Sequence, residues 1–567
     1  MKWSQILPPQ IPEELISLPL NPVILKLLVQ RGFSSEESVK KFLESRYEHL
    51  HSPHDLKGVD EAVERIKISN QKKERLVIYG DYDADGITST AILKEALQAV
   101  GLRADSYIPD RNKEGYGLNN KALDFIKSEY DADLLITVDC GTSNVEEIKY
   151  AGEKGMDVIV IDHHSIPKDV PKKCILINPK LPNQKYPFKE LAGVGVVFKF
   201  VEALWEEMIP KKKPFLKWFL DLVAIGTIAD CVPLVDENRI FAKFGLIVLQ
   251  KTKRLGVQEI IKTARLNINE KNPPNVENVA YQIGPRFNAA GRMDHADLAL
   301  NLLIEKDQVK ARIAALEIES KNCERQKITQ QILAEIKETL KPDENYKLII
   351  RKGRHWPIGI LGIVAGRITD EYRCPVFILR ESDEIIQGSG RSVEAFNIFS
   401  AVSQLDNLIE KFGGHSQAMG LKIKPGNIEE FEKKLAGIIE KEYDEDKWGK
   451  RINIDAELPA DEIDWDIFSD ITKLEPFGEG NREPILLSRG MKILEAKLVG
   501  NGQKHIKFVF EVNGGAKIIS GIFFKGGDYF SSIEEGSDVS VVYNLRSNTW
   551  NGNRKLDLNI IDLKKEE

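Results

Sequence analysis

Short apolar runs alternate with longer amphipathic segments between residue 75 and about residue 180. The runs RLVIYG (75–80), ADLLITVDCG (132–141), MDVIVIDHH (156–164) and KCILINPK (173–180) are rich in β-branched residues. Apolar runs of this length are typical of buried strands, and strands that alternate with helices form parallel sheets. The pattern therefore predicts an α/β region with a mostly parallel sheet and helices on both of its faces.

The hydrophobic pattern changes twice further along the chain. Residues 296–341 are charged, rich in Leu, Ile and Ala and nearly free of Gly and Pro, which predicts one or two long helices that connect two lobes. A second α/β segment follows from YKLIIRKG (346–353) to about residue 445. From about residue 451, short alternating runs with Gly and Asn turns predict a small β-barrel, and we expect the oligonucleotide-binding (OB) type.

These changes predict an α/β protein with two α/β lobes joined by long helices and followed by an OB-like β-barrel. The expected segments are an N-terminal helical part (1–70), a first α/β lobe (71–240), a helical connector (241–345), a second α/β lobe (346–447) and the barrel (448–567).

Composition adds few constraints. The chain has 567 residues, of which 42% are hydrophobic and 29% are charged, as in ordinary globular proteins. Its net charge of −7 argues against nucleic-acid binding through overall positive charge. Basic clusters such as QKKER (71–75) and PKKKPFLK (210–217) make local positive fields or form solvated faces.

The location of the protein is predicted from what the sequence lacks. We find no apolar core of signal-peptide type near the start and no charge-free run long enough to cross a bilayer, so no membrane partner is expected. The five cysteines form no Cys-x-x-Cys pair, which suits a reducing cytoplasm. Cys140 follows Asp139 and Cys231 follows Asp230, and both cysteines are interpreted either as small core residues or as redox-sensitive thiols.

Acidic and imidazole side chains follow several of the predicted strands. The carboxyl ends of strands in an open parallel sheet lie at one edge, where ligands bind. The groups that this topology brings together are Asp81, Asp83 and Asp85, then Asp139, then Asp162, His163 and His164, with Asp230 after a further apolar run. Carboxylates this close raise one another's pKa, and a bound divalent cation is the usual remedy.

Carboxylates with one or two imidazoles suit manganese or magnesium better than zinc, and two such ions are a standard arrangement for cutting a phosphoester. A calcium loop is excluded because Ile92 stands where DYDADG (81–86) would need its closing Glu. Taken singly, Asp139 and Asp230 are also explained as helix caps. The convergence of three successive strand ends favours the metal site.

Candidate phosphate-binding residues occur in four glycine-rich segments. Arg with nearby glycines, or a glycine-rich turn before a helix, can bind an anion through side chains and backbone N–H groups. The alternative for each segment is an ordinary turn with a surface arginine. The candidates are Arg111 in a loop after a probable strand, Arg286 and Arg292 in GPRFNAAGRM (284–293), Ser389, Gly390 and Arg391 just before an expected helix, and Gly413, Gly414 and His415 in KFGGHSQAMG (411–420).

In this order, the motifs DYDADG, DCG, DHH, GPRFNAAGR, GSGRS and GGHSQAMG resemble those of the DHH phosphoesterase superfamily. DHH itself is shared with family II pyrophosphatases and oligoribonucleases. GPRFNAAGR and the C-terminal β region narrow the resemblance to the RecJ family of single-strand-specific 5′→3′ DNA exonucleases, over nearly the whole chain. The resemblance implies that the first lobe is a DHH domain and the second a DHHA1-type domain.

The resemblance also implies a site with two Mn²⁺ ions, for which Mg²⁺ is a possible substitute. The matching ligands are Asp83, Asp85, Asp139, His163 and Asp230, while Asp81 is either a direct ligand or a residue behind the ligands. The implied catalytic residues are His164, which would face the scissile phosphate, together with Asp83 and Asp139.

Further residues match the family's substrate-binding positions. Ser389, Gly390 and Arg391 match a terminal-phosphate pocket, Arg111 and Arg286 match positions along the path of the strand, and Gly413, Gly414 and His415 match a second-lobe motif. Phe508 and Trp550 are candidates for stacking on bases in the barrel.

The implied reaction is hydrolysis of the 5′-terminal phosphodiester of single-stranded DNA, which releases 5′ mononucleotides in DNA repair and recombination. A helicase and a single-strand-binding protein are the expected partners. One alternative is a DHH-family oligoribonuclease or small-nucleotide phosphatase, which would not need the barrel. Another is an inactive DHH scaffold that binds nucleic acid, which would have lost ligands that are all present here.

Overall fold

The computed structural model describes residues 2–6, 10–111, 113–341, 344–449, 451–550 and 553–566. Within these ranges, no helix has the length and apolar character needed to span a membrane. The chain forms two compact units: one contains Met1–Leu50, Pro233–Lys243 and Lys450–Glu567, and the other contains His51–Val232 and Phe244–Gly449. The segment boundaries expected from the sequence stay predictions, because a compact unit can join parts that are distant along the chain.

The first sheet consists of β2 (Leu76–Tyr79), β3 (Ala104–Tyr107), β4 (Leu134–Val138), β5 (Asp157–Ile161) and β6 (Ile175–Ile177). Its strands are all parallel, in the order β3-β2-β4-β5-β6. Every residue of β2 and β4 is buried, as expected for parallel strands that are covered on both faces. The strands predicted from the four apolar runs are confirmed, and β2, β4 and β5 each end at candidate ligands.

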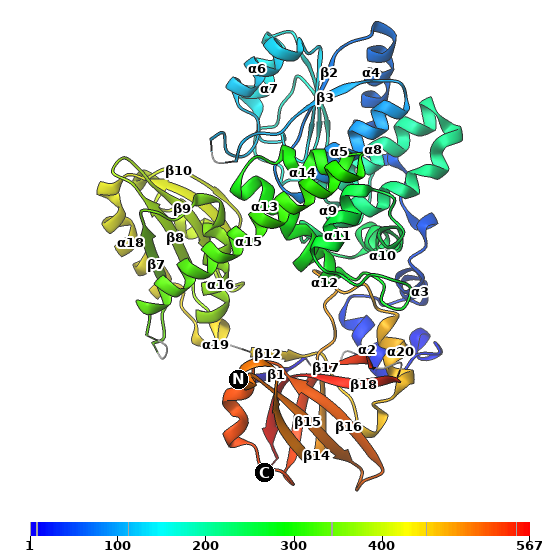
Figure 1. Ribbon diagram of the computed structural model, residues 1–567, viewed down its shortest axis with the longest axis vertical. Helices are drawn as coiled ribbons and strands as arrows, with labels where there is room; N and C mark the ends of the chain where they lie inside the picture. Colours follow the sequence, from blue (N-terminus) through cyan, green and yellow to red (C-terminus); the bar gives the residue numbers. More distant parts are fainter. Residues whose placement is uncertain are drawn as a thin grey trace. The chain divides into compact units, whose positions relative to one another are not determined.

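Helices cover both faces of this sheet, as predicted. α6 (Asn120–Tyr130) and α7 (Val145–Glu153) pack on one face through buried residues such as Leu123, Ile126 and Ile148. α5 (Ala84–Ala99) and α8 (Gly193–Met208) lie on the other face, with α4 (Val59–Lys72) beside α8 (Figure 1). Residues Ala84 to Leu93 of α5 are all buried, so the first turns of this helix lie inside the protein.

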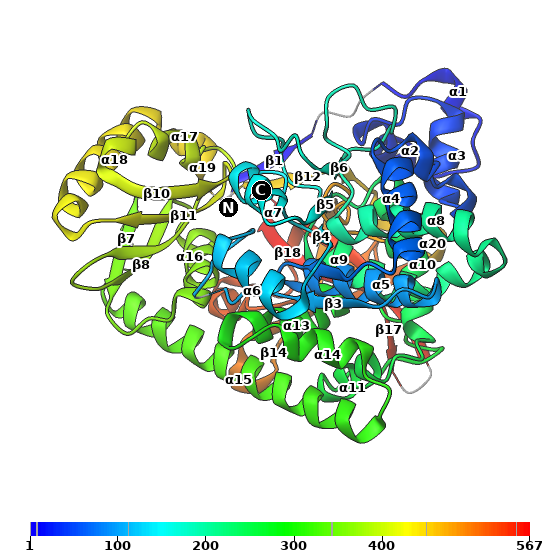
Figure 2. The same cartoon turned by 90° about the horizontal axis from the view of Figure 1, so that it is seen from above.

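Helices also make up the chain between the two sheets of this unit. α14 (Asp297–Ile304) and α15 (Gln308–Glu338) confirm the long helices predicted for residues 296–341. Figure 2 shows α15 extending from α11 and α14 to α16 (Ile358–Tyr372) in the second lobe. The other elements are η3 (Pro210–Phe219), α9 (Leu220–Ala229), α10 (Asp236–Gln250), α11 (Leu255–Thr263), α12 (Val276–Asn278), the π-helical turn η4 (Val279–Ile283) and α13 (Gly284–Met293).

The second lobe contains a mixed sheet with the order β10-β11-β9-β8-β7. Its strands are β7 (Ile349–Gly353), β8 (Val376–Glu381), β9 (Ile386–Arg391), β10 (Ile409–Gly414) and β11 (Ala418–Ile423). Only the β7–β8 pair is parallel among the described pairs. The lobe's helices are α16, α17 (Ile398–Ser403), α18 (Ile428–Glu442) and α19 (Glu445–Trp448), and α16 packs on β8 and β9.

Two predictions about this lobe were wrong. Ser389, Gly390 and Arg391 do not form a turn before a helix; they lie in β9, and α17 begins only at Ile398. The backbone of β9 is paired on both sides, with β8 and β11, so its N–H groups are not available to an anion. Gly413 and Gly414 lie at the end of β10, in a hairpin with β11 rather than before a helix.

The C-terminal part forms the predicted barrel. β14 (Leu486–Val499), β15 (His505–Val512), β16 (Lys517–Phe523), β18 (Asn553–Lys565) and β17 (Asp538–Trp550) pair in this order, and β17 also pairs with β14, which closes the barrel. Phe508 is fully buried in its core, so its predicted role in stacking on bases was wrong. The side chain of Trp550 lies outside the described part of the structure.

The N-terminal residues join this barrel in one hydrophobic core. β1 (Lys2–Gln5) pairs in parallel with β12 (Arg451–Ile454), so the N-terminal part is not purely helical. α2 (Pro22–Gln30) and α3 (Glu36–Glu44) contribute buried residues such as Ile24 and Leu28 to the core that holds Phe508. The remaining short elements are α1 (Glu13–Ile16), η1 (Tyr47–His49), η2 (Pro53–Asp55), β13 (Ala456–Glu457), η5 (Asp406–Leu408), η6 (Pro425–Asn427), η7 (Ala460–Glu462), α20 (Trp465–Thr472), η8 (Asn501–Gln503) and η9 (Gly527–Ser532).

Candidate metal and phosphate site

The loop between β2 and α5 holds three carboxylates in different ways. Oδ1 of Asp83 caps α5 by accepting hydrogen bonds from the N–H groups of Asp85 (2.9 Å) and Gly86 (3.1 Å). The carboxylate of Asp85 accepts hydrogen bonds from the N–H groups of Gly193 (2.7 Å) and Val194 (2.8 Å) at the start of α8. Asp81 is buried, and its Oδ1 has no hydrogen-bond partner among the described residues.

Asp139 and His163, at the ends of β4 and β5, face each other. Asp139 is buried in a left-handed backbone conformation (φ 60°), an uncommon geometry that is found at functional sites. Its Oδ1 lies 3.2 Å from Nε2 of His163, and neither atom has a hydrogen-bond partner within the described ranges. The same nitrogen lies 3.6 Å from Oδ2 of Asp230 and 3.9 Å from Oδ2 of Asp85. Five carboxylates and one imidazole therefore converge at one edge of the sheet.

We call this set the acidic cluster: Asp81, Asp83, Asp85, Asp139, His163 and Asp230. Its atoms form two groups of potential ligands, Asp81 with Asp83 and Asp139, and Asp85 with His163 and Asp230, and within each group the atoms lie within 4.8 Å of one another. A third such group joins Asp139 and His163 to His164. Buried oxygen and nitrogen atoms without partners, carried mainly by carboxylates, fit Mn²⁺ or Mg²⁺.

The electrostatics of the acidic cluster also fit a divalent cation. Burial, with repulsion from neighbouring carboxylates, raises the pKa of Asp81, Asp139 and Asp230 well above the ordinary value and that of Asp85 to about 7. Burial lowers the pKa of His163 to about 3, so its ring is neutral and can offer a lone pair. A bound cation would favour the ionised carboxylates and remove the repulsion.

Asp162 has a different role from its neighbours. Its carboxylate accepts hydrogen bonds from the N–H groups of Thr142 (2.9 Å) and His163 (2.8 Å), and it lies 2.8 Å from Nδ1 of His164. Burial alone would lower the pKa of His164, but the bond to Asp162 and nearby carboxylates raise it to about 9. This shift favours a protonated His164 at neutral pH in the metal-free protein, and Asp162 fixes the orientation of its ring.

Tyr116 is a candidate functional residue that was not predicted from the sequence. Its Oη lies 3.1 Å from Nδ1 of His164 and 3.3 Å from the carbonyl oxygen of Asp139. The side chain is half exposed, with 46% of its surface accessible, so it lies at the edge of the acidic cluster. Gly115 and Gly117 on either side both have positive φ, and this tight loop was the one available signal in the sequence.

In the second lobe, Ser389 and Arg391 point toward α16. A Cβ atom built on Gly362 would lie 2.8 Å from Nη2 of Arg391 and 3.3 Å from Oγ of Ser389. Gly420 and Gly413 continue the row of Ser389 across the sheet, so no side chain covers the neighbouring positions of that face. Arg391 forms no ion pair with a carboxylate in the described ranges, and His415 lies exposed in the hairpin turn.

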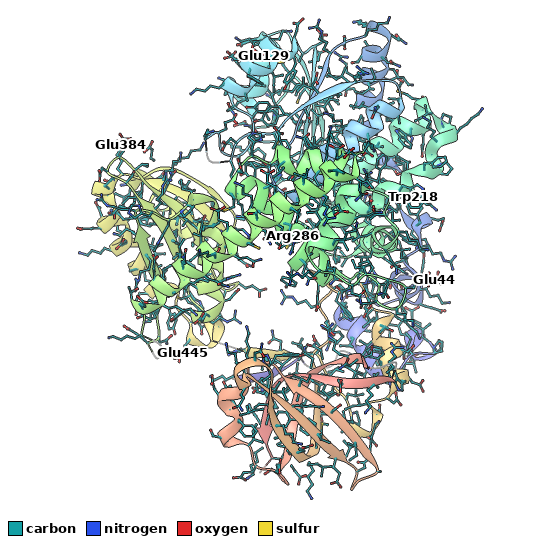
Figure 3. The ribbon with its side chains drawn as sticks, in the orientation of Figure 1. Glu44, Glu129, Trp218, Arg286, Glu384 and Glu445 are labelled. Atoms are coloured by element: carbon teal, nitrogen blue, oxygen red, sulfur yellow. The ribbon has the colours of Figure 1, made fainter. Side chains whose placement is uncertain are left out.

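The other arginines differ in their surroundings. Both sides of the Arg286 guanidinium are used inside the protein, by Glu319 (2.5 and 3.1 Å) and by the carbonyl oxygen of Gln282 (2.6 Å), where α13 meets α15 (Figure 3). The guanidinium of Arg111 lies over the ring of Tyr82, 4.7 Å from its centre. Arg111 also acts with burial to lower the pKa of Arg391, which places two cations near each other.

Matches to known protein families show which class of protein this chain belongs to. Residues 75–227 match the DHH family N-terminal domain, residues 345–441 match the DHHA1 domain, and residues 454–562 match the RecJ OB domain. A parallel sheet with Asp and His at its strand ends, followed by a DHHA1 domain, defines a DHH-family protein.

Similar individual proteins show the family within that class. The chain is 36% identical to the single-stranded-DNA-specific exonuclease RecJ of Bacillus subtilis, over 99% of this chain and 70% of that protein. It is 32% identical to the protein of the same name from Haemophilus influenzae, over 95% of each chain. A crystal structure of RecJ in complex with Mn²⁺ from Thermus thermophilus matches all of this chain and 80% of its own, with 29% identity and a TM-score of 0.83. A second structure, with Mg²⁺, has a TM-score of 0.78 at 27% identity, and covers 79% of its own chain. The chain belongs to the RecJ family of single-stranded-DNA-specific exonucleases.

Proposed function

We propose that this protein is a metal-dependent 5′→3′ exonuclease that removes 5′ mononucleotides from single-stranded DNA. The observation that carries the proposal is the acidic cluster, in which buried oxygen and nitrogen atoms of Asp81, Asp139 and His163 lack partners in the described part of the chain. Family membership over nearly the whole chain supports single-stranded DNA as the substrate. The direction of digestion and the product follow from the arrangement of the acidic cluster and the second lobe.

The acidic cluster would hold two ions, Mn²⁺ or Mg²⁺, which fits relatives solved with each metal. Asp81, Asp83 and Asp139 would bind on one side, and Asp85, His163 and Asp230 on the other, with Asp81 as a direct ligand because its Oδ1 is buried without a partner. When bound, the ions activate water and neutralise charge on the phosphoryl oxygens. The hydrogen bonds to Asp83 and Asp85 keep their carboxylates in place both with and without bound metal.

The reaction then depends on His164 and on the second lobe. The bond between phosphorus and the 3′ oxygen of the first nucleotide breaks, and a water oxygen forms the new bond to phosphorus. Protonated His164 would donate a hydrogen bond to the phosphoryl group or supply the proton to the departing 3′ oxygen. Ser389 and Arg391 would bind the 5′ phosphate, and because the shortened strand carries a new 5′ phosphate, the cycle can repeat.

Other substrate contacts follow from the same arrangement. Arg111 and the glycine row beside Ser389 would lie along the strand, with Gly414 and His415 at the hairpin that borders that row. Arg286 is less suited to this role, because Glu319 and Gln282 already use its donors. Since the substrate is single-stranded, a helicase must supply it from duplex DNA, and a single-strand-binding protein would keep it open, in cytoplasmic DNA repair and recombination.

The test uses a single strand of about 40 nucleotides, long enough to span the lobes and an OB barrel, labelled at either end. The unsubstituted protein is compared with the Asp83→Asn variant, which keeps the helix cap but loses the charge. We expect 5′-labelled mononucleotide and stepwise shortening of the 3′-labelled strand with Mn²⁺. Chelator and Asp83→Asn should each abolish both signals.

Two other outcomes of this test would indicate a different function. If the long strand survives while dinucleotides or pyrophosphate are hydrolysed, the protein is a DHH-family oligoribonuclease or small-nucleotide phosphatase. If nothing is hydrolysed and the protein still binds single strands, it is an inactive DHH scaffold. Efficient digestion of blunt duplex DNA would contradict the single-strand specificity.

A further inference from the structure

The helix α13 contacts two loops of the acidic cluster. A Cβ atom on Gly284, at the start of α13, would lie 3.0 Å from the Cβ of Ala229, the residue before Asp230. Further along α13, Oδ1 of Asn288 accepts a hydrogen bond of 2.7 Å from the N–H of Ala84, between Asp83 and Asp85. A Cβ on Gly291 would lie only 2.5 Å from the carbonyl oxygen of Tyr82. α13 is therefore packed against both loops at backbone distance.

The end of the same helix contacts the second lobe. Nη1 of Arg292 donates a hydrogen bond of 2.8 Å to the carbonyl oxygen of Gly359, in the first turn of α16. In return, a Cβ on Gly359 would lie 2.6 Å from the carbonyl oxygen of Arg292. One helix of 10 residues thus touches the metal-binding loops at one side and α16 at the other.

α16 continues this series of contacts to the Ser389–Arg391 pair. Gly359 and Gly362 are three residues apart on α16 and therefore lie on the same face of the helix. Gly359 faces Arg292, and Gly362 faces Oγ of Ser389 and Nη2 of Arg391. The contacts run without interruption from the loop of Asp81, Asp83 and Asp85 through α13 and α16 to the residues proposed to bind the 5′ phosphate.

The arginines around α13 and α16 would interact differently when a substrate phosphate is bound. Burial and the nearby cations Arg111, Arg325 and Arg391 lower the pKa of Arg292 to about 9, while Asp83 acts in the opposite sense. Arg325 is itself buried, and its Nε has no hydrogen-bond partner among the described residues. A phosphate bound at Ser389 and Arg391 would offset the repulsion among these arginines.

We propose that α13 and α16 form a spacer that sets the distance between the cleavage site and the 5′-phosphate site, with Arg292 as its positioning residue. The spacer rests on the proposed exonuclease function and deepens it. It explains how a phosphate held by Ser389 and Arg391 places the next linkage at the acidic cluster, so that cleavage falls one nucleotide from the end. GPRFNAAGR then serves mainly to hold two lobes at a fixed separation.

Three glycines on α16 allow a matched test with the same substitution. A Cβ at Gly359 meets the backbone of Arg292, a Cβ at Gly362 meets Ser389 and Arg391, and a Cβ at Gly366 meets nothing within 4 Å. Gly359→Ala, Gly362→Ala and Gly366→Ala are each made in the full chain. Binding of 5′-phosphorylated and 5′-hydroxyl strands is measured by fluorescence anisotropy. For this measurement each variant also carries Asp83→Asn, so that the strand is not cut. The value of kcat is measured without Asp83→Asn.

The spacer predicts a separation of binding from rate. Gly362→Ala should abolish the preference for a 5′ phosphate in binding, because its Cβ enters the phosphate site. Gly359→Ala should keep that preference but lower kcat on phosphorylated strands by about 10- to 100-fold, since the phosphate is bound while the linkage is misplaced. Gly366→Ala should behave as the wild type in both measurements.

Substitutions at Arg292 provide an independent test that leaves α16 unchanged. Arg292→Met should reproduce the effect of Gly359→Ala, because a thioether has no hydrogen to donate to the carbonyl oxygen of Gly359. Arg292→Lys should restore part of kcat, because an ammonium can still donate to that oxygen. In the variants without Asp83→Asn, Mn²⁺ affinity measured by titration calorimetry should stay at the wild-type value. This result would show that the acidic cluster is intact.

Each result supports or overturns the spacer. If Gly359→Ala and Arg292→Met match Gly366→Ala in kcat and in 5′-phosphate preference, the spacer is wrong. If Gly359→Ala does not fold, the comparison of Arg292→Met with Arg292→Lys decides, and equal kcat in both overturns the positioning role. A wild-type protein that never cuts 5′ ends would instead show that the proposed function itself has failed.

Discussion

The acidic cluster and the phosphate side, by which we mean Arg292 and Arg391 beside Ser389, are both buried or half-buried. Their charges are unbalanced in opposite senses. In the acidic cluster, burial and mutual repulsion raise the pKa of Asp81, Asp139 and Asp230. On the phosphate side, burial and neighbouring cations lower the pKa of Arg292 and Arg391. One region is suited to a cation and the other to an anion, which are the two parts of a metal-dependent reaction on a phosphodiester.

Another buried charged group in the same unit shows that such imbalance is not a necessary result of burial. Arg254 lies between Glu95 (2.6 Å) and Asp221 (3.3 Å), and Thr252 donates a further hydrogen bond of 2.7 Å to Asp221. Here each buried charge has a partner of opposite sign. In this unit, buried charges without such partners mark ligand sites, whereas paired ones mark structural contacts.

The largest expected effect separates Asp139 from Asp221. Asp139→Asn should lower exonuclease activity about 1000-fold or more, because a metal ligand is lost, while the metal-free protein becomes slightly more stable as repulsion is removed. Asp221→Asn should instead destabilise the fold by about 3 kcal/mol, since Arg254 loses part of its compensation. Urea unfolding and strand-degradation rates check both. A destabilised Asp139→Asn would contradict the assignment of its charge to a ligand site.

The next prediction concerns metal and pH. Folded-state pKa values above the unfolded ones, near 7 for Asp85, mean that the metal-free protein binds more protons than the unfolded chain. Its stability should therefore fall as the pH rises from about 4 towards 7, by about 1.4 kcal/mol per pH unit for each proton involved. Mn²⁺ removes the repulsion, so the rise in Tm that it causes should be larger at about pH 7.5 than at about pH 5.5. Differential scanning calorimetry checks this, and an equal rise at both pH values would count against it.

A smaller effect is expected on the phosphate side. Arg391→Gln and Ser389→Ala should each reduce the preference for 5′-phosphorylated strands by about 10- to 100-fold, the value of hydrogen bonds to a charged group. Because these residues lie outside the acidic cluster, Mn²⁺ affinity should not change. The measurement compares kcat/KM on strands with and without a 5′ phosphate. Loss of Mn²⁺ binding in Arg391→Gln would mean that the two regions are not separate.

The two regions also differ in how far the sequence predicted them. The first sheet was predictable because β2 and β4 are continuous apolar runs, and a parallel sheet places its strand ends at one edge whatever the loop lengths. This rule correctly predicted that Asp81, Asp139 and His163 lie at the same edge of the sheet. In the second lobe, Gly388 and Gly390 suggested a turn, yet they lie in β9, where a Cβ on Gly388 would lie 2.1 Å from the carbonyl oxygen of Ile378. Glycine there serves close packing, which no local pattern reveals.

The roles of single side chains were the hardest to predict. Arg286 and Arg292 occur in one motif, but Glu319 binds Arg286 from a helix that begins 22 residues later, at Gln308, and this pairing depends on how α15 packs. Tyr116 reaches His164 only because a loop with two positive-φ glycines turns it toward the strand ends. Tertiary contacts of this kind are set by the packing of whole elements, so the sequence pattern indicates the motif but not the partner of each residue.

Tyr116 gives the smallest predicted effect and tests the edge of the acidic cluster. Tyr116→Phe removes the hydroxyl that lies 3.1 Å from Nδ1 of His164 but leaves Asp162, which raises the pKa of His164 to about 9. We expect kcat to fall about fivefold, as for one hydrogen bond of about 1 kcal/mol. Activity should still decline as the pH rises through about 9, where His164 loses its proton. A pH–rate profile of the variant beside the wild type checks both values. A loss of more than about 100-fold, or an alkaline limb displaced by more than about one pH unit, would show that Tyr116 rather than Asp162 controls His164.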